Sequence, residues 1–171
     1  PRKAVVMITG NRGLAGGYNS NLIKLITKGE FVKEDLEIYA IGTKGRDALT
    51  RSGYHIKEVY QKLAEKASYT EVMEISHNLL SAYKNGEVGE VYLAYTSFKN
   101  TVSHEPRLIK LLPADTPEAS AGKEEDILMN FEPGAEEILE YIIPQYISSL
   151  IFGGLLESVA SENGARMQAM D

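Results

Sequence analysis

The beginning of the chain constrains its fold most, because a continuously apolar run at residues 4–8 leads directly into a glycine-rich turn at residues 10–17. Apolar runs of this length are typical of strands that are buried on both faces of a parallel sheet. The turn is followed by a helix-compatible segment that Asn19 or Ser20 can cap. A strand, a glycine turn and a helix in this order predict a mostly parallel α/β sheet with right-handed crossovers.

The rest of the chain continues this alternation of strands and helices. Ser68 and Glu71 have the spacing of a capping box at the start of a helix. Four further strands are expected, at residues 36–41, 91–97, 101–112 and 127–131. A hairpin turn is expected at residues 99–100, leading into the strand at residues 101–112. Pro106 lies within that strand and cannot donate a hydrogen bond to its neighbour, so the strand is expected at an edge or with a bulge. These elements predict a three-layer, Rossmann-like α/β domain with a mostly parallel five-stranded sheet and one antiparallel edge hairpin.

The C-terminal part of the chain is compatible with a long helix, which follows a solvated acidic loop at residues 114–126. Pro144 is expected to break or kink this helix. Beyond it, six side chains follow the 4-3-4-3-4 steps of a coiled-coil seam: Phe152, Leu156, Val159, Asn163, Arg166 and Met170. The seam predicts a partner helix, with folding back on its own domain as the alternative. We therefore predict a globular domain at residues 1–143 and the beginning of a longer helix at residues 144–171, in a fragment of a larger protein.

Composition excludes several classes of function. The chain has 171 residues, a net charge of -6 and no long basic run, which makes it a poor candidate for binding nucleic acid. It has no cysteine, and its three histidines lack metal-ligand spacing. Its unbroken apolar runs are far shorter than the roughly 20 residues of a membrane span. No nucleophile motif or acid–base constellation is apparent, so we predict no catalytic, cofactor-binding or metal-binding residues.

The glycine turn lies where dinucleotide-binding folds hold a pyrophosphate, but its spacing differs from theirs. The glycines read G-x-x-G-x-x-G-G instead of G-x-G-x-x-G, and no G-K-[ST] ending supplies a phosphate-binding lysine. The second strand is followed by Gly42, Thr43 and Lys44, where an NAD site would need an acidic residue. The pattern favours a structural and docking turn. A dinucleotide-binding enzyme and a stand-alone adaptor that uses the long helix are the alternatives.

Several segments together resemble the gamma subunit of F-type ATP synthase. The sequence TGNRGLAGGYN at residues 9–19 is similar to the family's DRGLCGGxN turn. SFKNT at residues 97–101 with LLP at residues 111–113 looks like its KFxNT…LLP hairpin, and FEP at residues 131–133 looks like its YEP element. Residues 156–170 are similar to its LxESxASExxARMxAM signature. The matches follow the family order along the chain, which makes the resemblance specific.

The resemblance implies a non-catalytic rotor, the central stalk that couples rotation of a membrane c ring to ATP synthesis or hydrolysis in a catalytic head. The implied partners are the alpha and beta subunits of the head, the epsilon subunit and the c ring, with no nucleic acid and no cofactor. The chain would hold the globular part and the start of the C-terminal stalk helix, without the N-terminal helix that pairs with it or the end of the C-terminal one. The implied location is the cytoplasmic face of a bacterial plasma membrane, which the subunit touches only peripherally through the c ring.

The resemblance also implies contacts for individual residues. Arg12, Ala15 and Arg166 match positions that face the acidic lever of the catalytic beta subunits, where arginine–carboxylate pairing suits a contact that must repeatedly break. Met129 and Phe131 match a strand end that meets the c ring. The chain departs from the family pattern at three positions. Asparagine stands in place of aspartate at residue 11, alanine in place of a frequent cysteine at residue 15, and methionine in place of a frequent tyrosine at residue 129.

Overall fold

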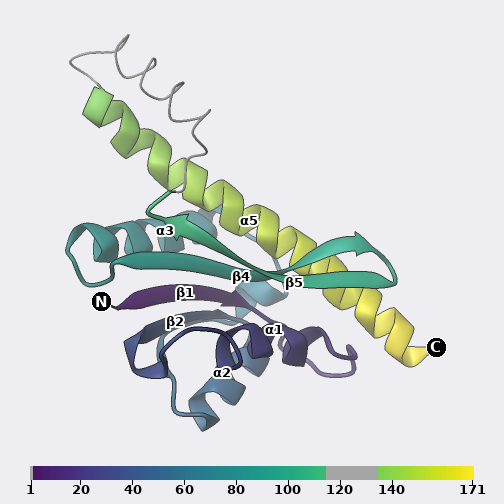
Figure 1. Cartoon of the computed structure of the whole chain (residues 1–171). Helices are drawn as coiled ribbons and strands as arrows, with labels where there is room; N and C mark the ends of the chain where they lie inside the picture. The colour runs from purple at the N-terminus through teal and green to yellow at the C-terminus, as the bar shows by residue number, and fades with distance from the viewer. Residues whose placement is uncertain (1, 115–134) are drawn as a thin grey trace.

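The computed structural model describes residues 2–114 and 135–171. Its centre is a five-stranded sheet with the strand order β3-β2-β1-β4-β5 (Figure 1). The strands are β1 Lys3–Ile8, β2 Leu36–Ile41, β3 His55–Tyr60, β4 Glu90–Asn100 and β5 Ser103–Leu112. The pairs β1–β2, β1–β4 and β2–β3 are parallel, and the pair β4–β5 is antiparallel. The predicted fold class, a mostly parallel sheet with one antiparallel edge hairpin, is confirmed.

Helices cover both faces of the sheet and complete the three predicted layers (Figure 1). On one face lie α1 (Tyr18–Thr27) and α2 (Thr43–Arg51). On the other lie α3 (Tyr69–Lys84) and α5 (Ala135–Met170). Two short 3₁₀ helices are η1 (Lys33–Asp35) and η2 (Lys62–Ala64). In the chain, α1, α2 and α3 each lie between two strands of the sheet, whereas α5 follows the last described strand.

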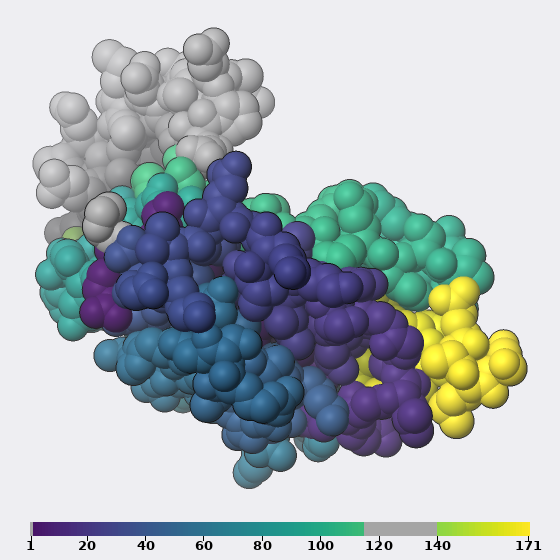
Figure 2. All heavy atoms as spheres, turned by 60° about the horizontal axis from the view of Figure 1, so that its bottom comes forward, coloured from purple at the N-terminus to yellow at the C-terminus, as the bar shows by residue number. Residues whose placement is uncertain are grey.

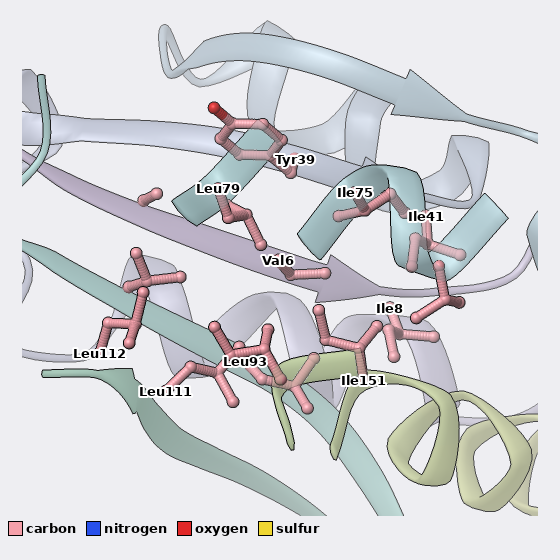
Figure 3. Packing of buried hydrophobic residues seen from close by; sticks show 14 of the residues in the cluster. Val6, Ile8, Tyr39, Ile41, Ile75, Leu79, Leu93, Leu111, Leu112 and Ile151 are labelled. Atoms are coloured by element: carbon pink, nitrogen blue, oxygen red, sulfur yellow. The ribbon is translucent and has the colours of Figure 1, made fainter. Parts of the chain in front are cut away.

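Alternate side chains of β1 fill two separate cores, one on each face of the sheet. Val5 and Met7 belong to the core under α1 and α2, whereas Val6 and Ile8 belong to the core under α3 and α5. Figure 3 shows the second core, in which Ile151 of α5 lies close to Ile8. Because both faces of β1 are covered, its run of apolar residues is continuous and not alternating.

Two details of the sheet differ from the sequence prediction. The pattern does not predict β3, because this edge strand is largely exposed and mixes polar with apolar residues. The strand predicted at residues 127–131 lies outside the described residues. The hairpin turn falls at Thr101 and Val102, later than predicted, because β4 continues to Asn100. Asn100 Oδ1 stabilises this turn by accepting a hydrogen bond from Val102 N–H at 2.9 Å.

The last helix, α5, has 36 residues, about 54 Å at 1.5 Å per residue, and it continues through Pro144 without the expected break. Proline removes one backbone N–H and costs about 3 kcal/mol inside a helix. Glu140, four residues earlier, loses the partner of its carbonyl but is exposed, so water can bond it. Burial of Ile147, Ile151 and Leu155 contributes roughly 1.5–3 kcal/mol each, which more than offsets the cost.

By length and composition alone, Glu140–Met170 of α5 is long and apolar enough to cross a membrane, with a mean hydropathy of 1.3. This average was not apparent from the short unbroken apolar runs of the sequence. However, 39% of the apolar window is buried within the protein. A core helix of a soluble protein gives the same reading, so the apolar character of α5 is weak evidence for a span.

The helix α5 has two apolar faces. One face is buried against β4 and α3 and includes Ile147, Ile151 and Leu155. The opposite face exposes large apolar side chains, each 47–70% accessible: Ile142, Tyr146, Leu156, Met167 and Met170. They belong to a row at heptad spacing, residues 142, 146, 149, 153, 156, 160, 163, 167 and 170, which we call the outer stripe.

The outer stripe differs from the predicted seam at alternate positions. It runs through residues 153, 160 and 167, where the prediction had the residue before each of them. Phe152 of the predicted seam packs edge-on against Tyr69, with ring centroids 5.4 Å apart, and Val159 packs against the core. Leu156 and Met170 are exposed as expected. The helix therefore folds back on its own domain with one face, as the alternative had it, and the partner helix for the outward face stays a prediction.

Candidate docking site at the glycine turn

The glycine turn follows β1 at the carboxyl edge of the parallel strands. Because β1 lies between β2 and β4, the turn stands where the strand order changes direction, the place at which α/β folds bind ligands. The helix α1 begins at Tyr18 with Gly17 as its N-cap and no side-chain cap. The predicted cap by Asn19 or Ser20 is therefore wrong. Asn19 instead stabilises the turn, since its Oδ1 accepts a hydrogen bond from Gly10 N–H at 2.8 Å.

Side chains of the protein engage backbone amides around the turn. Asn11 Oδ1 accepts a hydrogen bond from Thr43 N–H at 2.9 Å, at the start of α2, and Thr9 Oγ1 accepts one from Gly45 N–H at 2.9 Å. Asn11 Nδ2 also donates to the Gln61 carbonyl oxygen at 2.9 Å. Asn11 thus uses both ends of its amide, which an ionised aspartate could not do because it cannot donate. These amides are occupied and do not face a phosphate.

A carboxylate of α5 lies against the first glycine of the turn. A Cβ atom added at Gly10 would come within 2.8 Å of Cδ and both carboxylate oxygens of Glu162. Glu162 is only 8% exposed, so its negative charge is poorly screened by water. The Glu162 side chain thus fills the space beside the first glycine, which a pyrophosphate would need to approach. The geometry therefore weighs against the dinucleotide-binding alternative.

Arg166 joins α5 to the glycine turn. Its Nη2 donates to Glu162 Oε2 at 2.7 Å, one helical turn earlier, and to the Gly13 carbonyl oxygen at 3.4 Å. Figure 2 shows the yellow end of α5 emerging beside the purple N-terminal segment that contains the turn. Between them lies a hollow of about 360 Å³, which we call the arginine hollow; its polar lining includes Asn11, Arg12, Glu65, Glu162, Asn163 and Arg166.

The arginine hollow brings together two of the five residues predicted to make contacts, Arg12 and Arg166. Arg12 is exposed, whereas only 16% of the Arg166 side chain is accessible. Two cationic side chains at one opening suit a carboxylate-bearing partner. The site therefore offers cationic side chains to an acidic group, and the first amide of the turn, that of Gly10, is already bonded to Asn19.

The other predicted contact residues are placed differently. Ala15 is buried at 2% exposure, where it packs against Tyr18 and Ala165. Its neighbour Leu14 is 80% exposed and has a φ of 61°, so the outward side chain at this point of the turn is leucine. Met129 and Phe131 lie outside the described residues.

Buried polar groups fix α5 to the sheet beside the site. Ser158 Oγ accepts a hydrogen bond from Thr96 N–H of β4 at 3.0 Å. Burial raises the pKa of Tyr18 well above its usual range, and the nearby Glu162 charge raises it further. The Tyr18 hydroxyl therefore stays neutral at physiological pH. The hydrogen bond between Ser158 and Thr96 holds this part of α5 against β4.

Sequence reasoning missed Glu162 and the arginine hollow. Glu162 precedes Arg166 by four residues, the spacing of a helical ion pair, and this signal is readable in the sequence. The approach of Glu162 to Gly10 is not readable, because the two residues are far apart in the chain and meet only when α5 folds onto the sheet.

Fold and site define a class of protein: a three-layer α/β domain that presents a long two-faced helix and a charged hollow. Within residues 2–114 and 140–171, no group of three or more His, Asp or Glu side chains is placed to hold a metal ion. A family model described as ATP synthase matches residues 1–171. The chain therefore belongs to the ATP synthase family.

Individual relatives are gamma chains of bacteria. The chain is 56% identical over 177 residues to the ATP synthase gamma chain of Lachnoclostridium phytofermentans, covering 99% of this chain and 61% of the relative. It is 36% identical over 187 residues to the sodium-ion-specific ATP synthase gamma chain of Acetobacterium woodii, covering 99% of this chain and 62% of the relative. The chain thus spans about three fifths of the length of these relatives.

A solved structure shares the fold. The central stalk and c-ring structure of the Tetrahymena thermophila mitochondrial ATP synthase contains a chain that superposes with a TM-score of 0.75 at 23% identity. The match covers 99% of this chain and 75% of that chain. At this identity the likeness supports the fold, including a long helix that crosses an α/β domain.

Proposed function

We propose that this chain is part of the central rotor-stalk subunit of a proton-translocating F-type ATP synthase. In this role it is not an enzyme itself. It transmits torque between a rotating c ring and a catalytic head in which ATP is made or hydrolysed. The observation that carries the proposal is α5, a helix with one face fixed to a close-packed domain and the opposite face apolar and exposed.

The outer stripe of α5 fits a second helix. Its exposed side chains recur at heptad spacing, and small residues stand between them at Gly153 and Ala160. Full burial of a large apolar side chain is worth roughly 1.5–3 kcal/mol, so a partner that covers a half-exposed one, such as Leu156 at 49%, contributes on the order of 1 kcal/mol. Residues of the longer subunit outside this chain are the proposed source of that helix, paired antiparallel to α5. The pair would carry twist away from the domain.

The rigid attachment of α5 suits torque transfer. The buried face of the helix is part of the main core, and Ser158 with Thr96 adds a polar contact that must break before the helix can rotate. Close-packed cores resist deformation. A twist applied to the helix would therefore turn the whole α/β domain with it.

The proposed partners follow from the resemblance to the gamma subunit. The arginine hollow, with Arg12 and Arg166, faces the acidic lever of the beta subunits in this proposal, and Ala15 contributes through the turn that it holds in place. Met129 and Phe131 are assigned to the c ring, and the epsilon subunit lies beside the domain. The complex would hold the subunit at the cytoplasmic face of a bacterial plasma membrane, peripherally.

The outer stripe gives the test of this function. Leu156→Asp in the full-length subunit removes apolar burial and places a charge in the helix pair, so assembly with the catalytic head and c ring should weaken roughly tenfold or more. ATP-driven ion pumping by reconstituted membranes should fall in parallel. Because Leu156 is 49% exposed, the α/β domain should keep its stability.

Val32→Asp is the matched control. Val32 is also exposed, at 56%, but it lies before η1 and away from α5. The control should assemble and pump like the wild type. Wild-type assembly of the Leu156→Asp subunit would contradict the proposed helix pair and with it the rotor function.

A further inference from the structure

The carboxylate of Glu162 occupies the inner wall of the arginine hollow. Its side chain is 11% accessible and lies in the notch that the missing side chain of Gly10 leaves open. A buried carboxylate is costly unless a cation pairs with it. Among the described residues, the ion pair recorded for Glu162 is with Arg166, at 2.7 Å. The charge of Glu162 is therefore matched to that of Arg166.

The guanidinium of Arg166 is only partly used by this pair. Its Nη2 makes both recorded contacts, to Glu162 and to the Gly13 carbonyl. A guanidinium carries five N–H donors, so Nε and Nη1 hold three that have no recorded acceptor within the described parts of the chain. A carboxylate that enters the hollow could use these donors while Glu162 remains bound at the other side.

We propose that Glu162 is a positioning residue that also competes for Arg166: it fixes the guanidinium toward the arginine hollow and cancels part of its charge. This proposal rests on the proposed contact between the hollow and an acidic partner. Binding of the partner is then weaker than two free arginines would give. A contact on a rotating element must release at every step, and an internal carboxylate favours release.

Replacement of the carboxylate separates positioning from charge. In Glu162→Gln the side chain keeps its length and a carbonyl oxygen that can accept from Nη2, but the negative charge is gone. The affinity of an acidic probe should therefore rise, by about three- to tenfold at low salt, as expected for a charge a few ångströms away at a partly buried site. The gain should shrink in high salt, because added ions screen the charges.

The control is Glu65→Gln. Glu65 also lines the hollow, but it is exposed and has no recorded bond to Arg166. This variant has the same net charge as Glu162→Gln, so it reports the general effect of one fewer acid. Its affinity should change by less than about twofold, because solvent screens an exposed charge. Glu162→Asp, which keeps the charge, should bind like the wild type.

The experiment uses the 171-residue chain and a hexaglutamate peptide as the probe, with binding followed by NMR at low and at high salt. Circular dichroism and thermal unfolding confirm that each variant is folded. A gain in Glu162→Gln that is absent from Glu65→Gln, and that disappears in the double variant with Arg166→Gln, supports the proposal. The comparison between these variants is decisive even where the wild type binds too weakly to detect.

Two results overturn the proposal. One is an affinity of Glu162→Gln no higher than that of Glu65→Gln. The other is a gain that survives the loss of Arg166. Neither result touches the rotor function, because that function is tested separately by assembly of the Leu156→Asp subunit, in which the arginine hollow is unchanged.

Discussion

The glycine at residue 42 should be indispensable to the edge of the sheet that carries the docking site. Gly42 has a φ of 94°, and a Cβ atom there would clash with the backbone carbonyl of Thr9. Neither group can move easily, because Thr9 N–H donates to the Ile41 carbonyl at 2.8 Å and Lys44 N–H donates to the Gly10 carbonyl at 3.0 Å. The cost of a methyl group therefore has two parts.

The magnitude of Gly42→Ala follows from these parts. With φ 94° and ψ 144°, Gly42 lies in the mirror-image β region that glycine alone adopts readily, and such a backbone costs another residue on the order of 1–3 kcal/mol. Overpacking against backbone costs typically 1–3 kcal/mol more. The sum, about 2–6 kcal/mol, is a large fraction of the 5–15 kcal/mol that stabilises a typical domain.

Gly86→Ala is a control that has a positive φ but no clash. Gly86 also has a positive φ, 75°, but an added Cβ would meet nothing within 4 Å. Urea unfolding followed by circular dichroism should give a loss of about 1–2 kcal/mol for Gly86→Ala and at least 1 kcal/mol more for Gly42→Ala, with unchanged m values. Equal losses in the two variants would refute the clash with Thr9 as the cause.

Two further outcomes are expected. Titration calorimetry of the purified chain with NAD, NADP and ATP should show no micromolar binding, because Gly10 N–H is bonded to Asn19 and the Glu162 side chain fills the space beside Gly10. Micromolar affinity at the turn would restore the dinucleotide-binding alternative. Burial raises the pKa of Tyr39 to about 12, so the folded state keeps this hydroxyl protonated. Its contribution to the free energy of unfolding is full below about pH 10 and is lost as the pH rises toward 12. Tyr39→Phe should reduce this decline of the free energy of unfolding with pH, measured by urea unfolding, whereas an unchanged decline would contradict the assignment to Tyr39.

The sequence predicts the centre of the fold better than its edges. β1 and β2 are covered on both faces, so burial dictates apolar residues at nearly every position and the strands are readable. β3 has only one neighbouring strand and is largely exposed, so little in its sequence is constrained by the core. Its existence depends on pairing with β2, which a local pattern cannot reveal.

The docking site is predictable only in part, for a similar reason. Arg12 and Arg166 follow from the family resemblance, and the structure brings both to one hollow. The burial of Ala15 and the wall formed by Glu162 depend on how α5 lies across the sheet. The register of the outer stripe has the same origin: heptad spacing fits several neighbouring rows of α5, and the sheet decides which row is left exposed.

The outer stripe has a geometric consequence for whatever helix covers it. Heptad steps advance by 3.5 residues per turn, whereas a straight α-helix has 3.6, so the row of exposed side chains drifts by about 20° per heptad. Over the four heptads from Ile142 to Met170, the drift reaches about 80°, close to a quarter of the circumference. A partner that stays on the stripe must wind around α5 with a left hand. Such a pair is tightened by twist in one sense and loosened by twist in the other, so clockwise and anticlockwise rotation would load it unequally.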